Sequence, residues 1–184
     1  MGDVTLLMEQ ARGGDRGALD RIFGLLYPQL REIAHRRLAP HQRNGTLDTT
    51  ALVNECYLKF VQRDGLKPSD RAYFLAYAAS VMRSIIVDTA RQSLTERRGG
   101  DVQHQTLDTA AVETLAGPAD EIVDVDAAMQ QLAAVDPRLV QVVEMRYFGG
   151  MKDDEIAQAL EVSARTVQRD WEKARLLLAH ALRG

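Results

Sequence analysis

The hydrophobic residues of this chain recur at helical spacing along most of its length. In the N-terminal part, apolar side chains fall three or four positions apart in successive segments, and turn formers such as Gly13-Gly14 and Asp64-Gly65 separate these segments. No segment alternates between apolar and polar residues as a half-buried strand would. The pattern therefore predicts an all-α fold whose first helices cover residues 4–11, 18–38, 49–62 and 71–95.

A second helical group occupies the C-terminal part, and its clearest portion covers residues 149–178. A short first helix carries an apolar stripe of Ile156, Ala157 and Leu160 behind a cluster of acids, which suit the positive end of a helix. Ser163 offers a side-chain oxygen that can cap the next helix. The residues of that second helix that should face the core are Val167, Trp171, Ala174 and Leu178. The short turn between them predicts a C-terminal helix-turn-helix.

Between the two helical groups the apolar positions are sparse, and Thr, Gln, Asp and Ala prevail. This change predicts an N-terminal helical domain over residues 1–98, a linker over 99–120 and a C-terminal domain over 121–184. Because the linker is long and polar, we expect the two domains to be poorly fixed or held by modest contacts. If they do pack, the basic faces at 71–98 and 165–173 should be partly hidden, and binding to DNA should be weak.

The charge is unevenly distributed along the chain, although the formal net charge is only −3. Residues 1–100 hold 15 Lys and Arg against 11 Asp and Glu, residues 101–136 hold 8 acids and no Lys or Arg, and residues 137–184 hold 8 against 7. The acidity is therefore concentrated in the middle, while both flanks are mildly basic. Local basic patches decide phosphate binding, so the overall acidity does not exclude a nucleic acid as partner.

Several function classes lack their signals in this sequence. The lone Cys56 lies in an amphipathic segment and should be a buried hydrophobe, and the four His residues are far apart, so we expect no metal. There is no phosphate-binding Gly loop and no nucleophile elbow, so we expect no enzymatic activity and no cofactor. No apolar run approaches 18 residues, so we expect a cytoplasmic protein with no membrane partner.

The second helix of the predicted helix-turn-helix carries an outward face suited to DNA. Such a helix lies in the major groove, where Arg and Gln side chains can bond two groups of one base. The alternative is a helical hairpin with a solvated charged face, and Glu161 stands in the turn where Gly or Asn is common. The residues that we expect to face DNA are Arg165, Gln168, Arg169 and Lys173.

The predicted helix over 71–95 interleaves aromatic and basic side chains. Aromatic rings beside arginines suit single-stranded bases, which need a surface to stack on and cations near their phosphates. The alternative is that the aromatic residues belong to the core. The candidate nucleic-acid-binding residues of this segment are Arg71, Tyr73, Phe74, Tyr77, Arg83 and Arg91, with Arg97 and Arg98 beyond them.

Taken in order, these segments resemble the extracytoplasmic-function sigma factors of bacterial RNA polymerase. Residues 18–23 are similar to region 2.1, 51–60 to region 2.2, 73–91 to regions 2.3 and 2.4, and 136–150 to region 4.1, which leads into the helix-turn-helix of region 4.2. Each match is short, but five matches in the expected order and spacing cover nearly the whole chain.

The resemblance implies two partners, core RNA polymerase and promoter DNA. It implies that Asp48, Asn54 and Glu55 bind the β′ clamp of the polymerase, that the C-terminal domain contacts the β flap, and that the linker follows the RNA exit path. The loop at 63–72 and the helix after it would capture flipped bases of the −10 element. The arginines near residues 83–98 would hold upstream phosphates, and the face at 165–173 would read the −35 element.

One segment departs from the family pattern. Members of the family usually carry Asp-Ala-Glu-Asp-Leu-Val-Gln-Glu before region 2.2, whereas this chain has Thr50 and Ala51 at the second and third acids. A phosphate on Thr50, or on Thr49, would restore about −1.5 to −2 charges at a helix start. This places the chain in an acid-poor subgroup that a Ser/Thr kinase could control. The alternatives are that both Thr residues only begin the helix, and that the regulator is an anti-sigma factor.

A different class of protein shares the C-terminal motif. A helix-turn-helix transcriptional regulator with an N-terminal helical sensing domain would need a ligand pocket within residues 1–98. It would also dimerise on paired half-sites of DNA. Co-purification with core polymerase separates the two classes.

Overall fold

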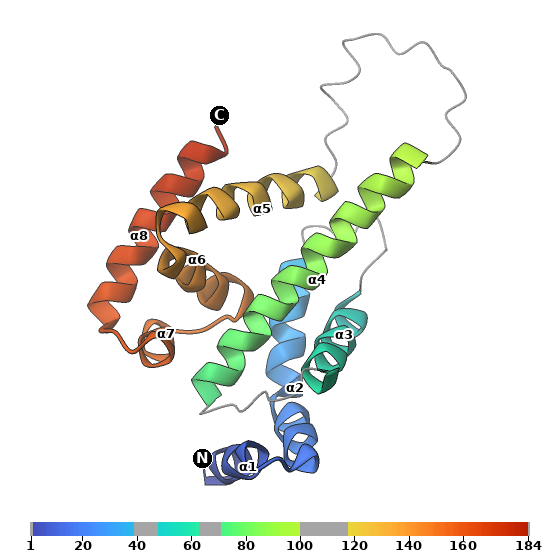
Figure 1. Cartoon of the computed structure of the whole chain (residues 1–184), viewed down its shortest axis with the longest axis vertical. Helices are drawn as coiled ribbons and strands as arrows, with labels where there is room; N and C mark the ends of the chain where they lie inside the picture. Colours follow the sequence, from blue (N-terminus) through green and yellow to red (C-terminus); the bar gives the residue numbers. More distant parts are fainter. Residues whose placement is uncertain (1, 39–47, 63–70, 100–117, 184) are drawn as a thin grey trace.

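The computed structural model of the 184-residue chain describes residues 2–38, 48–62, 71–99 and 118–183 (Figure 1). Throughout these residues the regular structure is helical, as the apolar spacing predicts, and they contain no strand. The elements are α1 (Gly2–Arg12), α2 (Arg16–Leu38), α3 (Thr49–Gln62), α4 (Arg71–Gly99), α5 (Pro118–Val135), α6 (Pro137–Val143), the π-helical segment η3 (Glu144–Phe148), α7 (Asp153–Leu160) and α8 (Ala164–Ala181). Among the described helices, none is long and apolar enough to span a membrane.

The helix boundaries follow the predicted ones closely, except at the linker. Helix α4 continues to Gly99 and α5 already begins at Pro118, so residues 99 and 118–120 of the predicted linker are helical. The rest of that linker, residues 100–117, lies outside the described residues. So do residues 63–70 of the loop expected to capture bases.

Helices α1 to α4 form the N-terminal half, and its centre is aromatic. The rings of Phe60 and Phe74 lie 4.7 Å apart, and Phe23 of α2 packs edge-on against both at 5.8 and 6.3 Å. Such edge-to-face pairs stabilise a core beyond their buried area alone. Cys56 is fully buried beside them on α3, as its amphipathic segment predicts.

Helices α5 to α8 form the C-terminal half. Asp136 begins α6 by accepting a hydrogen bond from the Arg138 amide at 3.0 Å, and Pro137 fills the first helical position, where no amide donor is needed. Helix α6 then runs without a break into η3. A small core joins α5, α6 and α8 through Met129, Leu132, Leu139 and Ala174.

The two halves share one hydrophobic core, with α4 packed against α5, η3 and α7 (Figure 1). The Gly149-Gly150 turn permits this approach. A Cβ on Gly149 would lie 3.1 Å from the Ala79 Cβ, and one on Gly150, which has φ +59°, would lie 3.1 Å from Ile33 Cγ1. The residues of the C-terminal half that enter the shared core include Val142, Met145, Phe148 and Ile156. The expectation of poorly fixed domains with modest contacts is therefore wrong for this structure.

Candidate nucleic-acid interface

Helices α7 and α8 are joined by a three-residue turn, and both ends of the turn are fixed by local hydrogen bonds. Glu161 ends α7 in the left-handed conformation with φ 54°, although it is not Gly or Asn. Ser163 begins α8, and its Oγ accepts a bond from the Thr166 amide at 3.2 Å, as the sequence predicts. At the other end of α7, the Lys152 amide donates to Glu155 Oε2 at 2.9 Å.

Helix α8 has one anchored face and one exposed face. Val167 and Ala174 are fully buried, and between them the buried Asp170 accepts a bond from Arg138 Nε at 2.7 Å. A buried carboxylate needs such a partner, and the pair ties α8 to α6. On the opposite side, all of the residues expected to face DNA are exposed: Arg165, Gln168, Arg169 and Lys173.

A cation and an aromatic ring hold α8 against the rest of its half. The Arg146 guanidinium lies 4.8 Å from the centre of the Trp171 ring and is paired with Asp153 at the start of α7. Burial lowers the pKa of the Arg146 guanidinium below its ordinary value. Gln168 Nε2 also donates to Asp153 Oδ2, at 3.2 Å, so one exposed residue of α8 is already oriented.

The aromatic residues of α4 divide between core and surface. Phe74 is 1% exposed and belongs to the core, so its ring is not available to a base in this structure. Tyr77 is half-buried, and its ring stands edge-on to Phe60 at 4.7 Å. Tyr73 is 43% exposed and is the most exposed of these three rings.

Arg71, in the first turn of α4, contacts the C-terminal half. Its guanidinium pairs with Glu155 of α7 and donates to Gln29 Oε1 of α2 at 2.7 Å. This Arg is therefore held between two helices that lie far from it in the sequence. It does not project freely toward solvent.

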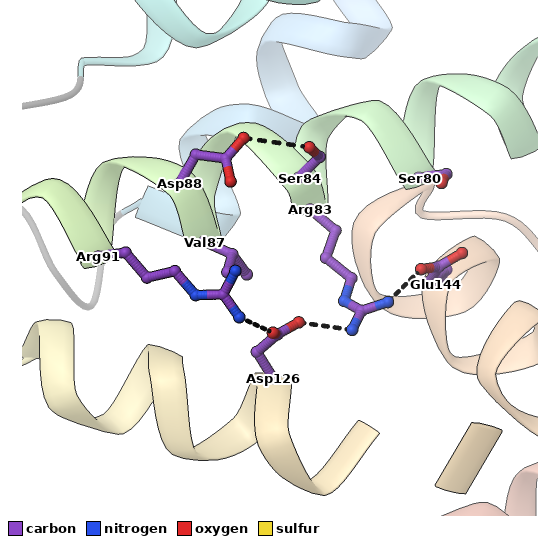
Figure 2. Close-up of a pocket in the computed structure, with 8 residues that line it drawn as sticks. All are labelled: Ser80, Arg83, Ser84, Val87, Asp88, Arg91, Asp126 and Glu144. Carbon is purple, nitrogen blue, oxygen red and sulfur yellow. Dashed lines mark hydrogen bonds and ion pairs between the residues drawn. The ribbon is translucent and has the colours of Figure 1, made fainter. Parts of the chain in front are cut away.

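Arg83 and Arg91, further along α4, also bond to acids of the C-terminal half (Figure 2). Arg83 donates to Glu144 Oε1 and to Asp126 Oδ1, both at 2.6 Å. Arg91 donates to the second oxygen of Asp126 at 2.8 Å, and Gln130 donates to the same oxygen at 2.9 Å. Asp126 is 5% exposed, and both of its carboxylate oxygens accept hydrogen bonds. The side chains of Arg97 and Arg98 lie outside what the structure describes.

The sequence carries one signal for these acidic partners. On α5 the spacing of Ile122, Asp126 and Met129 puts an acid in line with apolar residues. Burying a carboxylate among apolar side chains is unfavourable in free energy unless a cation pairs with it. An acid within an apolar stripe therefore predicts a buried ion pair. Glu144 likewise stands between the buried Val143 and Met145. The identity of the cation cannot be read from such a pattern.

The residues expected to bind a protein partner lie on and before α3. Asp48 caps the helix, with its Oδ1 accepting from the Ala51 amide at 2.7 Å. Thr50, Asn54 and Glu55 are exposed on the helix that follows. Thr49 is only partly exposed, so Thr50 is the more accessible hydroxyl of the pair.

A cavity of about 420 Å³ lies between the two halves of the molecule. Apolar side chains of α4, α5 and α8 line most of it, and the Arg37 guanidinium lies over the Tyr147 ring at 3.8 Å. The alternative of a ligand-sensing regulator requires a pocket within residues 1–98. This cavity differs, because residues of both halves line it.

A family model described as ECF sigma factor matches residues 1–184. The chain therefore belongs to the ECF sigma factor family. It is an alternative sigma factor, a non-enzymatic initiation factor that directs RNA polymerase to promoter DNA. Searches of the curated proteins and of the solved structures find no match. The family match decides between the two function classes considered above in favour of the sigma factor.

Proposed function

We propose that this sigma factor reads the −35 element with the exposed face of α8, in a helix-turn-helix formed with α7. The observation that carries this proposal is the two-sided character of α8: four polar or basic side chains are exposed, while Val167, Asp170 and Ala174 fix the opposite side. A rigidly anchored helix can present Arg and Gln to base edges in the major groove. In this proposal Arg169 reads a base and Lys173, one turn further, holds a phosphate.

A promoter library tests this division of labour in the holoenzyme. Arg169→Ala should lose about 1–3 kcal/mol of discrimination at one position of the −35 element. Lys173→Ala should weaken all sequences about equally and reduce the salt dependence of binding. Arg183, exposed beyond the end of α8, supplies a charge-matched control, and Arg183→Ala should change neither property. Identical profiles for the first two variants would overturn the assignment.

The −10 element is assigned to the first part of α4. Tyr73 supplies an exposed ring for an unstacked base, and Arg71, Arg83 and Arg91 supply cations for the DNA backbone. The loop that would complete the base pocket, residues 63–70, lies outside the described residues. In the structure these arginines are paired with acids, so DNA must compete with those acids.

Docking on the polymerase is assigned to the surface of α3. Asp48, Asn54 and Glu55 are all exposed there and would meet the β′ clamp, while the C-terminal half would meet the β flap. Exposed ion pairs contribute only about 0.2–1 kcal/mol each, so two missing acids weaken this docking by a modest amount. A single modification that adds negative charge can reverse a loss of binding free energy of this size.

We assign that modification to Thr50, as the target of a Ser/Thr kinase. Thr50 is exposed in the first turn of α3, and Asp48 already provides the cap, so a phosphate there adds charge without replacing the cap. It would carry about −1.5 to −2 charges where the helix dipole favours an anion. It would also stand at a position where the family pattern has an acid.

The Thr50 switch is tested by titrating the protein with core polymerase at two salt concentrations. Protein phosphorylated on Thr50 should bind more tightly than unmodified protein, and the gain should shrink as salt rises. Thr49→Ala should keep the response to the kinase, whereas Thr50→Ala should lose it. Equal affinity of the phosphorylated, unmodified and Thr50→Ala forms would exclude the switch and leave the docking surface itself unaffected.

A further inference from the structure

Every arginine of α4 whose side chain the structure describes is bonded to an acid of the C-terminal half. Arg71 meets Glu155, Arg83 meets Glu144 and Asp126, and Arg91 meets Asp126. These acids come from α7, η3 and α5, which are separate elements. A whole row of cations is therefore neutralised by one half of the molecule acting on the other.

The Arg83 guanidinium has the geometry of an anion-binding site that carboxylates already occupy. Two of its nitrogens donate to two different carboxylates at 2.6 Å, and its side chain is only 16% exposed. A guanidinium binds phosphate through the same paired donors that it offers a carboxylate. DNA phosphate and the two acids therefore compete for the same atoms, and solvent has little access to them.

We propose that Asp126 and Glu144 form an autoinhibitory clasp that occupies the phosphate-binding groups of Arg83 and Arg91 in the free protein. The clasp rests on the proposed role of α4 in promoter binding. The Arg83 side chain is only 16% exposed, so promoter DNA reaches it only when α5 and η3 withdraw from α4. The Arg91 side chain is 51% exposed, and there a DNA phosphate has to displace Asp126. A polymerase surface that binds the open arrangement more tightly than the closed one supplies the free energy for that withdrawal.

Asp126 has the central position in the clasp because its two oxygens join both arginines (Figure 2). Glu144 contacts Arg83 alone among these arginines. Loss of the Asp126 charge should therefore release more of the clasp than loss of the Glu144 charge. This ranking separates the clasp from a general effect of net charge, since each change removes one negative charge.

The test measures binding of labelled promoter DNA to the full-length protein without polymerase, by fluorescence anisotropy. Asp126→Asn should tighten binding on the order of tenfold, a typical coupling between sites. Asp124→Asn, an exposed acid on the same helix, is the charge-matched control and should change binding little. Adding Arg83→Ala to Asp126→Asn should abolish the gain. Equal effects of Asp126→Asn and Asp124→Asn would overturn the clasp.

Two further measurements keep the outcomes distinct. If circular dichroism shows that Asp126→Asn does not fold, Glu144→Gln decides the question, with a smaller gain in affinity expected and no gain overturning the clasp. In the holoenzyme, Arg83→Ala should weaken promoter binding. If it does so while Asp126→Asn brings no gain in the free protein, the clasp fails and the assignment of α4 to promoter DNA stands. If Arg83→Ala has no effect there, that assignment itself fails.

Discussion

Arg71, at the start of α4, pairs with Glu155, in the first turn of α7, although they lie 84 positions apart in the sequence. Burial of the Glu155 carboxyl acts to raise its pKa. The hydrogen bonds from the Lys152 amide and from Arg71 oppose burial and prevail, so the pKa of Glu155 lies below its ordinary value of 4.5. The ion pair between Arg71 and Glu155 therefore depends on the ionisation of Glu155.

The lowered pKa predicts how this contact responds to acid. A carboxylate with a depressed pKa in the folded state stabilises the fold above its unfolded pKa, here about 4.5, and loses that contribution as the pH falls through the lowered value. Glu155 is partly exposed, so the contribution should be below about 1 kcal/mol. Urea unfolding at pH 7 should therefore show Glu155→Gln to be less stable than the parent, and the difference should vanish in acid.

Glu9, an exposed acid of α1, supplies the control for this comparison. Glu9→Gln should leave stability unchanged at both pH values. A difference between Glu155→Gln and the parent that persists at low pH would show that the side chain acts through packing, not through its charge.

The left-handed backbone conformation of Glu161 predicts that its substitution by Gly stabilises the protein. Its φ of 54° places an L-residue in the left-handed region, which Gly occupies without strain. Glu161→Gly should raise the free energy of unfolding by about 0.5–1 kcal/mol, since relief of strain exceeds the added entropy of the unfolded chain. Glu172→Gly, at an exposed position within α8, should instead lower it by about 1 kcal/mol. Thermal unfolding of both variants checks the pair, and a loss of stability for both would contradict the prediction.

The burial of Cys56 predicts that its thiol is alkylated slowly in the folded protein. Desolvation by burial raises the pKa of its thiol to about 12, although Lys59 nearby acts in the opposite direction. Near pH 8 the reactive thiolate should be about a thousandfold rarer than in a thiol of ordinary pKa. Modification by iodoacetamide should therefore follow global unfolding and accelerate with urea. Rapid labelling of the native protein would show that α3 opens locally.

Much of the helical fold could be predicted because its signals are local. The Ser163 cap and the apolar stripe of α8, from Val167 to Leu178, depend on residues within one or two turns of one another. The exposed face of α8 follows from the same periodicity, because burying Val167 turns Arg169 outward. These features need no knowledge of the rest of the chain.

The packing of the two halves could not be predicted, because it depends on contacts between distant residues. Arg83 meets Asp126 across 43 positions, and Gly150 lies close to Ile33 of α2. The length and polarity of the linker limit how far the halves can separate, but they do not indicate whether the halves are in contact. The aromatic pattern of α4 was ambiguous for the same reason: Phe74 and Tyr73 are neighbours in sequence, yet one is buried and the other exposed.

Photo-crosslinking in the holoenzyme tests the central claim most directly. A crosslinking amino acid in place of Gln168 on α8 should react with the −35 element, and one in place of Tyr73 on α4 should react with the −10 element. The same group at Glu9, exposed on α1, serves as the control and should give little DNA product. Products from Gln168 that lie outside the −35 element, or only on polymerase subunits, would contradict the assignment of α8 to promoter reading.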